Sequence, residues 1–189
     1  MKKKLGFCMC GSFCTHKKAL DVMRDLIRRY DVVPIFSYNT LNADTRFGTA
    51  SLLKENVEGI CSHKVLSSIT ECERLGPADP LDVMMICPCT GNTLAKIALG
   101  ITDTPVTMAV KAHLRSERPL LIALATNDAM STNFVNIGTL LNRKNVFFVP
   151  MKEDDPDGKP HSLVADFSRS EECLIEAENK KQVRPLFVN

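Results

Sequence analysis

The sequence has no long hydrophobic run, no large excess of charge, no internal repeat and no segment of low complexity. No stretch approaches the roughly 20 apolar residues of a membrane-spanning helix, which predicts a soluble protein with no membrane partner. The net charge is only +2 and the basic residues are scattered, which argues against a nucleic-acid partner. A globular protein with one sizeable core is the class that these absences favour.

An export signal and a paired-cysteine metal site are also absent. Three lysines precede a short apolar run, but Gly11-Ser12 interrupts that run and no small-residue cleavage site follows. Eight cysteines without a secretion signal are typical of reduced thiols in the cytoplasm. Because none forms the Cys-x-x-Cys pair of structural zinc sites, and Cys8 and Cys10 fit small core positions on one strand face, we expect no metal ion.

Apolar runs and helical periods alternate along the chain. Strands are predicted at 5–10, 32–36, 83–86, 120–124 and 146–149, and helices at 16–30, 92–99, 105–115, 132–141 and 167–179. Residues 45–76 predict two short helices, 49–55 and 67–75, around a strand at 60–65, and 152–161 predicts a surface loop. Pro34 indicates that its strand lies toward a sheet edge. The alternation predicts an α/β fold, a three-layer α/β/α sandwich with a mostly parallel sheet, in one domain spanning 1–189.

Small and polar residues follow the predicted strands. They are Gly11-Ser12, Ser37, the stretch Pro88 to Thr93, and Ala125 to Asp128. In an open α/β sheet, ligands bind in the crevice outside the carboxyl ends of the strands, so we expect these four segments to converge on a polar, phosphate-bearing ligand. Neither a Gly-x-Gly-x-x-Gly fingerprint nor a Gly-Lys-Ser/Thr phosphate loop is present, which favours a mononucleotide over a dinucleotide.

One turn carries a family resemblance. Pro88-Cys89-Thr90-Gly91-Asn92-Thr93, with residues 94–103 after it, resembles the Pro-Ala-Ser-Ala-Asn-Thr turn of the Rossmann-like flavoprotein family that includes flavin-containing cysteine decarboxylases. A second motif of that family, Pro-Ala-Met-Asn-x-x-Met, is matched at Ala125, Asn127 and Met130, whereas Leu124 and Thr126 replace its proline and first methionine. The resemblance implies bound FMN and a homo-oligomer, a trimer or larger, with apolar α-helical residues such as Leu94, Ile97 and Ala98 at the contact.

A narrower resemblance covers nearly the whole chain and is to the B subunits of dipicolinate synthases. It is carried by Thr45-Arg46-Phe47-Gly48, Leu75-Gly76-Pro77, Pro80-Leu81-Asp82, Thr126-Asn127-Asp128-Ala129, residues 145–150, Asp154-Asp155-Pro156 and Lys159-Pro160. It implies an oxidoreductase of sporulating bacteria, located in the mother-cell cytoplasm, that converts dihydrodipicolinate to pyridine-2,6-dicarboxylate. The final acceptor NAD(P) would be held by the partner, the A subunit of dipicolinate synthase, which agrees with the missing dinucleotide motif here.

The residues expected to contact the phosphate and ribityl chain of FMN share a position at strand ends. They are Gly11, Ser12, Ser37, Pro88, Cys89, Thr90, Gly91, Asn92, Thr93 and Thr126. The start of the helix after Pro88 aims N–H groups and the positive helix end at one point, which suits a phosphate. Asn, Ser and Thr also cap helices without any ligand, and at Ser37 the two interpretations are evenly balanced.

Three residues are candidates for the dicarboxylate substrate. Asn127 stands where decarboxylase relatives carry an asparagine that contacts the substrate carboxyl, and the resemblance implies a binding and catalytic role for it. Arg46 and Arg115 are candidate clamps, because a guanidinium binds carboxylates through two parallel hydrogen bonds. A turn amide and two solvated surface charges are the alternative interpretations.

Three other functions remain open. A flavin prenyltransferase shares the stretch around Pro88, but Met108 and residues 125–129 replace the arginine and the Pro-Arg-Glu-Thr-Pro segment of those enzymes. A peptidyl-cysteine or phosphopantothenoylcysteine decarboxylase is disfavoured by the partial second motif. A non-catalytic scaffold protein would keep the fold and lose the flavin.

Overall fold

The parallel part of the sheet contains β1 (Lys3–Met9), β2 (Tyr30–Phe36), β3 (Val83–Cys89), β4 (Leu120–Thr126) and β5 (Val146–Phe148). The computed structural model describes residues 1–188. Two short strands, β6 (Met151–Glu153) and β7 (Leu163–Ala165), extend the sheet in antiparallel orientation. The strand order is β2-β1-β3-β4-β7-β6, and β5 also pairs with β4. The mostly parallel α/β sheet predicted from the sequence is confirmed.

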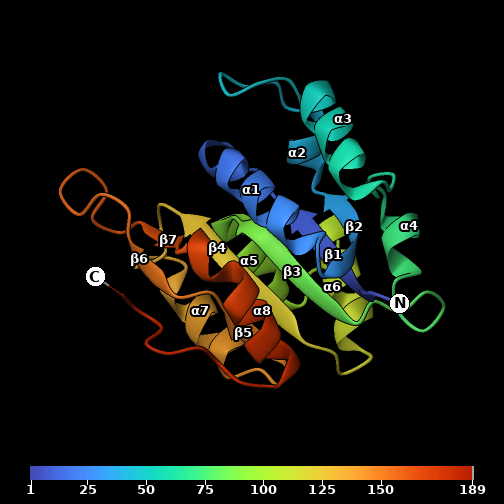
Figure 1. Ribbon diagram of the computed structural model, residues 1–189. Helices are drawn as coiled ribbons and strands as arrows, with labels where there is room; N and C mark the ends of the chain where they lie inside the picture. Colours follow the sequence, from blue (N-terminus) through green and yellow to red (C-terminus); the bar gives the residue numbers. More distant parts are fainter. Residues whose placement is uncertain (189) are drawn as a thin grey trace.

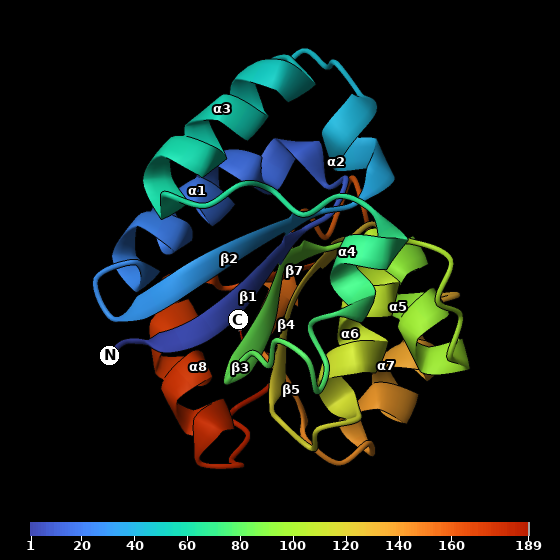
Figure 2. The same cartoon turned by 90° about the vertical axis from the view of Figure 1, so that its right-hand side faces the viewer.

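Helices cover both faces of this sheet (Figure 2). One face carries α1 (His16–Leu26) and α8 (Ser170–Glu178), with α3 (Ala50–Cys61) packed beside α1. The other face carries α4 (Ile69–Glu73), α5 (Gly91–Leu99), α6 (Pro105–Leu114) and α7 (Phe134–Leu141). A short α2 (Tyr38–Asn42) follows β2, and the 3-10 turns η1 (Phe13–Thr15) and η2 (Phe167–Arg169) precede α1 and α8. The three-layer arrangement is therefore confirmed.

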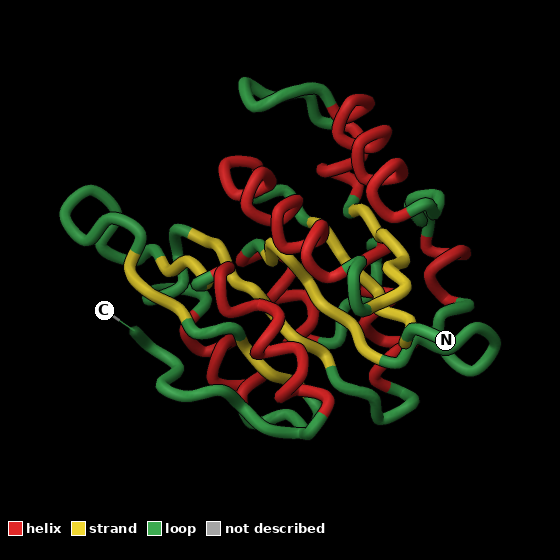
Figure 3. The backbone as a smooth tube through the Cα atoms, viewed as in Figure 1, coloured by secondary structure: helices red, strands yellow, loops and turns green. Residues whose placement is uncertain are grey.

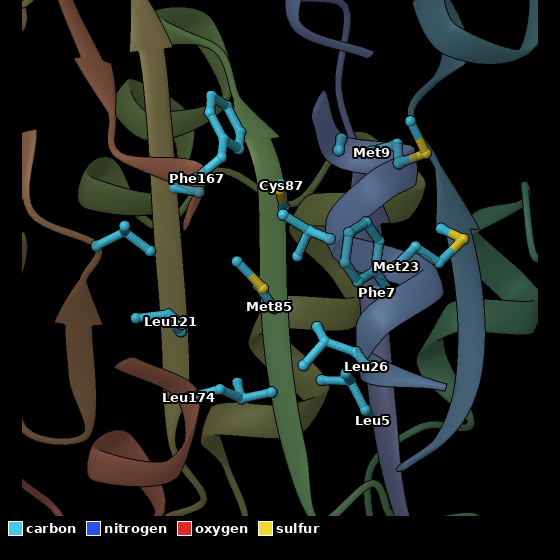
Figure 4. Packing of buried hydrophobic residues seen from close by; sticks show 14 of the residues in the cluster. Leu5, Phe7, Met9, Met23, Leu26, Met85, Cys87, Leu121, Phe167 and Leu174 are labelled. Atoms are coloured by element: carbon cyan, nitrogen blue, oxygen red, sulfur yellow. The ribbon is translucent and has the colours of Figure 1, made fainter. Parts of the chain in front are cut away.

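Alternation along the strands divides the apolar core between the two faces of the sheet. Leu5, Phe7 and Met9 of β1 point toward α1, where Met23 and Leu26 meet them (Figure 4). Cys8, and Cys10 directly after the strand, point the other way, toward α5 and α6, and both are buried as small core residues. Successive side chains of a strand point to opposite faces of the sheet, so a strand that is apolar at successive positions is buried against helices on both faces.

Pro34 lies in an edge strand, as predicted. Its carbonyl accepts a hydrogen bond from Leu66 N, at 2.9 Å, on the side away from β1. Because the N–H and C=O of one residue point to the same side of a strand, the missing N–H of Pro34 also faces outward. The proline therefore removes no hydrogen bond between β2 and β1.

Several boundaries differ from the sequence prediction. Tyr30 starts β2 instead of ending the first helix, and the helix predicted at 49–55 continues to Cys61. The strand predicted at 60–65 is wrong: Ile60 and Cys61 finish α3, and only Leu66 forms a bridge, with Ile35. β6 lies partly inside the predicted surface loop. Figure 3 shows the helices and strands along the backbone. β6 and the bridge at Leu66 depend on pairing with segments distant in the sequence, about which a local pattern says little.

Within residues 1–188, no helix has both the length and the apolar character required to cross a lipid bilayer.

A matched pair of leucine deletions tests the position of the core. Leu174 in α8 is fully buried, whereas Leu52 in α3 is 63% exposed. We expect Leu174→Ala to lower the free energy of unfolding by about 2–5 kcal/mol, since it removes buried apolar volume and leaves a cavity. Leu52→Ala should change it by less than about 0.5 kcal/mol. Urea unfolding measures both, and equal losses would contradict the placement of α8 on the sheet.

Candidate functional site

The loops after β1, β2, β3 and β4 meet at one edge of the sheet, the edge toward which β3 points in Figure 1. Cys10 N donates a hydrogen bond to Pro88 O at 3.2 Å, which places Gly11 beside the turn that begins at Pro88. Ser37 N donates to Met9 O at 3.0 Å, which brings the end of β2 to the same place. The convergence expected from the sequence is therefore present.

The turn after β3 is internally bonded. Thr90 is extended, with φ −85° and ψ 158°, and its hydroxyl accepts a hydrogen bond from Thr93 N at 3.3 Å, so it caps α5. The Cys10 thiol lies under this turn: burial raises its pKa to about 11, and hydrogen bonds to Thr93 and Thr90 offset part of the rise. Asn92 is exposed in the first turn of α5.

Gly91 packs tightly against the turn after β4. A Cβ atom at Gly91 would lie 2.5 Å from Asn133 Nδ2 and 2.6 Å from both Asp128 Oδ1 and Thr126 Oγ1. These three side chains form a small network, in which Thr126 donates to Asp128 at 2.5 Å and Asn133 donates to Asp128 at 2.8 Å. Glycine is needed at 91 because no other residue leaves room for this contact.

Asp128 is the site residue that the sequence analysis missed. Its carboxylate lies beside the first residue of α5, near the positive end of that helix. The sequence feature that could have indicated Asp128 is its position in Thr126-Asn127-Asp128, directly after an apolar strand. A phosphate at the start of α5 would face the Asp128 carboxylate, and the Thr90 hydroxyl already accepts the Thr93 N–H there. The start of α5 is therefore a poorer place for an anion than the sequence predicts.

The turn after β1 suits an anion better. No side chain caps η1 or α1: Ser12 O accepts from Thr15 N at 3.0 Å and from Thr15 Oγ1 at 2.8 Å, while the Ser12 hydroxyl has no hydrogen-bond partner within residues 1–188. The buried His16 donates from Nε2 to Cys10 O at 2.8 Å, and burial lowers its pKa, so the ring is neutral near pH 7. Because Thr15 N and His16 N already donate to Ser12 O and Phe13 O, the N–H groups of Phe13 and Cys14 and the Ser12 hydroxyl are the donors that this turn leaves for a phosphate.

Ser37 has a structural role in the fold. Its hydroxyl accepts a hydrogen bond from Thr40 N at 3.3 Å and caps α2, and Thr40 donates its own hydroxyl hydrogen to Met9 O at 3.0 Å. The capping interpretation therefore accounts for this side chain. A ligand contact at Ser37 stays a prediction.

Asn127 lies at the same edge and is exposed. Its Oδ1 accepts a hydrogen bond from Ser162 Oγ at 3.4 Å, and the same hydroxyl is 3.3 Å from Thr126 O. Because the amide oxygen faces Ser162, the amide nitrogen is left to donate to another group.

The two arginines lie in different parts of the fold. Arg115 follows α6 and is close in the chain to Pro119, which directly precedes β4, so it lies at the amino edge of the sheet, opposite the site. Arg46 is in the exposed loop between α2 and α3, which projects from the sheet at the top of Figure 1, and its guanidinium lies 4.9 Å from the centre of the Phe47 ring. Within one copy of the chain, Arg115 is not positioned to clamp a ligand at the carboxyl edge.

A hollow of about 400 Å³ adjoins the turn after β1. It lies between α1 and the loop that follows α2, and Phe13, Phe47 and Lys17 are among its lining residues, none of which is acidic. Two aromatic side chains and a cation suit a planar, anionic or electron-poor ring. Within residues 1–188, no three His, Cys, Asp or Glu side chains are grouped so as to hold a metal ion.

Comparison with known proteins gives a consistent picture. The model of the Flavoprotein family matches residues 1–168. The chain is 36% identical to the B subunit of dipicolinate synthase from Bacillus subtilis (strain 168), over 98% of this chain and 94% of that protein. The crystal structure of the B subunit of dipicolinate synthase from Bacillus halodurans C superposes with a TM-score of 0.91 and 35% identity, covering 100% of this chain and 99% of that one. The FMN-dependent cysteine decarboxylase SpaF is more distant, with a TM-score of 0.65 and 25% identity over 93% of this chain and 97% of its own.

Two glycine substitutions test the packing of the site. Gly91→Ala places a methyl group against Thr126, Asp128 and Asn133, so we expect a loss of about 1–3 kcal/mol in the free energy of unfolding. Gly59→Ala in α3 meets no atom within 4 Å and should stabilise the protein by about 0.4–1 kcal/mol. Chemical denaturation of both variants decides the point, and a neutral Gly91→Ala would show that the two turns are not in contact.

Proposed function

The chain belongs to the flavoprotein family and, within it, to the family of dipicolinate synthase B subunits, and we propose from this premise that it acts with the A subunit of that enzyme to oxidise dihydrodipicolinate. The reaction yields pyridine-2,6-dicarboxylate. The ring loses two electrons and two protons: NAD(P)+ takes both electrons with one proton and becomes NAD(P)H, and the other proton is released. Formation of an aromatic ring supplies the driving force. Sporulating cells, with the mother-cell cytoplasm as the location, are the proposed context.

The observation that carries this proposal is the likeness to B subunits along nearly the whole chain, loops included. Relatives with other activities, such as cysteine decarboxylases, share the fold with much lower similarity. Fold alone would not separate these activities.

FMN is the proposed cofactor of this chain, and the carboxyl edge of the sheet fits it. The turn after β1, with the Ser12 hydroxyl, would hold the phosphate, Gly11 would let the protein backbone approach the ligand closely, and the aromatic hollow adjoins this edge. Further contacts would come from the turn 88–93, which the bond from Cys10 N to Pro88 O joins to the turn after β1, and from Thr126, which lies beside Gly91. When bound, FMN supplies two-electron redox chemistry.

The chain's own residues contribute binding and orientation. The free amide nitrogen of Asn127 would donate to a substrate carboxylate, which fixes one end of the ring at the edge of the site. Buried groups such as Cys10 and Cys89 remain thiols, because burial raises the pKa of each. The A subunit would bind NAD(P) and hold it close enough to the dihydropyridine ring to accept its electrons.

A reconstitution with the purified A subunit tests the function. We expect formation of pyridine-2,6-dicarboxylate with one equivalent of NAD(P)H, followed by ultraviolet absorbance, only when both proteins are present. Asn127→Ala should lower kcat/KM by about 10- to 100-fold, since one charge-assisted hydrogen bond is lost. A mixture that turns over at the same rate without this chain would contradict the proposal.

Spectroscopy tests whether the chain binds FMN, and the choice of substrate distinguishes the proposed activity from its alternatives. A purified chain with the visible absorbance of flavin, or one that gains thermal stability from added FMN, supports the flavin role; a colourless chain with neither property supports a scaffold protein. Product formed from dimethylallyl phosphate and FMN without the A subunit would instead support a prenyltransferase.

We also propose that copies of this chain associate through α5 and α7. Leu94 and Ile97, expected at the contact, are buried within the single chain, but Leu99, Phe134 and Val135 are 72%, 55% and 68% exposed on these adjacent helices. α7 contains no charged residue from Phe134 to Leu141. An uncharged helix face with large exposed apolar side chains is typical of an interface.

A charge substitution on that face tests the association. We expect Val135→Arg to reduce the mass in solution to that of one chain, measured by light scattering, because it places an unpaired cation in an apolar contact. Leu52→Arg, on an exposed position of α3, is the control and should leave the mass unchanged. A monomeric wild-type chain would refute the proposed interface.

A further inference from the structure

The segment between β6 and β7, residues 154–162, is bonded to the turn that follows β4. Ser162 Oγ donates to Asn127 Oδ1 at 3.4 Å and lies 3.3 Å from Thr126 O, and Met130 N donates to His161 O at 3.0 Å. In Figure 1 this segment extends on the side toward which β3 points. Residues 154–162 therefore belong to the edge that carries the candidate site.

This segment holds a cation, Lys159, whose backbone is bonded to Ser162, the residue that contacts Asn127. Ser162 N donates to Lys159 O at 2.9 Å, and Lys159 N donates to Asp155 O at 2.7 Å, so the backbone of Lys159 is fixed one turn from Ser162. Its Nζ forms an ion pair with Asp154 Oδ2 at 2.8 Å, and both side chains are almost half exposed. The ion pair can therefore be reached from solvent.

The charges around Lys159 come mainly from its own segment. Asp154 is the main cause of the raised pKa of Lys159, and Asp155 and the Cys14 thiol in η1 are smaller contributors. The segment of Lys159 is itself bonded to the turn after β4.

A dicarboxylate substrate needs a positive partner here. Asp128, at the turn after β4, is negative, and Arg115 is at the opposite edge of the sheet. Arg46 lies in the projecting loop after α2. Asp154 and Lys159 also belong to the stretches Asp154-Asp155-Pro156 and Lys159-Pro160, which the chain shares with the B subunits. The candidate site described above gives these two residues no role.

We propose that Lys159 binds a carboxylate of the substrate, and that this carboxylate replaces the Asp154 carboxylate on its ammonium group. The inference rests on the proposed function. A lysine ammonium has three donors, so in this proposal it engages one oxygen of the substrate carboxylate, and the Asn127 amide, which Ser162 joins to the same segment, donates to the other. An exposed ion pair contributes little stability, so its exchange for a substrate carboxylate costs little. Asp154 then competes with the substrate for Lys159.

The competition predicts opposite effects for the two partners in the two-subunit enzyme. We expect Lys159→Gln to raise KM for dihydrodipicolinate by about 10- to 100-fold with little change in kcat, because it removes a contact made before the reaction. Asp154→Asn should lower KM by about 2- to 5-fold, because it frees the ammonium group. Lys159→Arg should restore most of the affinity lost in Lys159→Gln.

Lys152→Gln is the matched control. Lys152 is exposed in β6, at the base of the same segment, and has no ion-pair partner within residues 1–188. It should leave KM and kcat at wild-type values. The thermal midpoint of every variant is measured in parallel, so that a purely structural effect is recognised.

Several outcomes would overturn the inference. They are an unchanged KM for Lys159→Gln, a KM that rises equally in Asp154→Asn, or the same rise in Lys152→Gln. Calorimetric titration with pyridine-2,6-dicarboxylate separates this inference from the proposed function. If the wild type binds this dicarboxylate and Lys159→Gln does not, the assignment of Lys159 stands even where no turnover occurs; equal binding, or none to the wild type, refutes it.

Discussion

The close contact between the first residue of α5 and the turn after β4 is the constraint on which the site depends. Gly91 has no room for a Cβ atom, since Thr126, Asp128 and Asn133 fill that space. This contact joins the loops of two neighbouring parallel strands, and the bond from Cys10 N to Pro88 O joins a third. Loops that are far apart in the sequence therefore form one surface, because parallel strands end at the same edge.

Electrostatics then divides that surface into two parts. Asp128 brings negative charge to the start of α5, whose first turn Thr90 already caps. No side chain caps the turn after β1, and its Phe13 and Cys14 N–H groups are the donors proposed to face an anion. The family motif and the proposed anion site are thus adjacent but different: the turn 88–93 makes the close packing contact, and the turn after β1 would supply hydrogen-bond donors.

The sequence was sufficient for the parallel strands and for the loops that follow them. Runs such as 120–124 are apolar on both faces, and a strand of that kind must be covered by helices. Gly91 and Thr126 were expected as cofactor contacts from motif position, and the structure shows that they contact each other. Asp128 and the proposed role of Lys159 were not expected, because they depend on contacts across the fold: the start of α5 meets Asp128, and Ser162, from the segment of Lys159, bonds to Asn127. Residue type alone made Arg115 a candidate, whereas its position after α6 places it at the amino edge of the sheet within one copy of the chain.

The antiparallel β6–β7 ribbon has an evolutionary consequence. It joins the sheet through only two residues of β4, Ala125 and Thr126, beyond the part of β4 that pairs with β5. Insertions or replacements in its exposed tip, residues 152–161, would alter the surface beside the turn after β4 without disturbing the buried residues of β6 and β7. A fold of this design can acquire new surface preferences by changing one appendage while the parallel sheet beneath it is inherited intact.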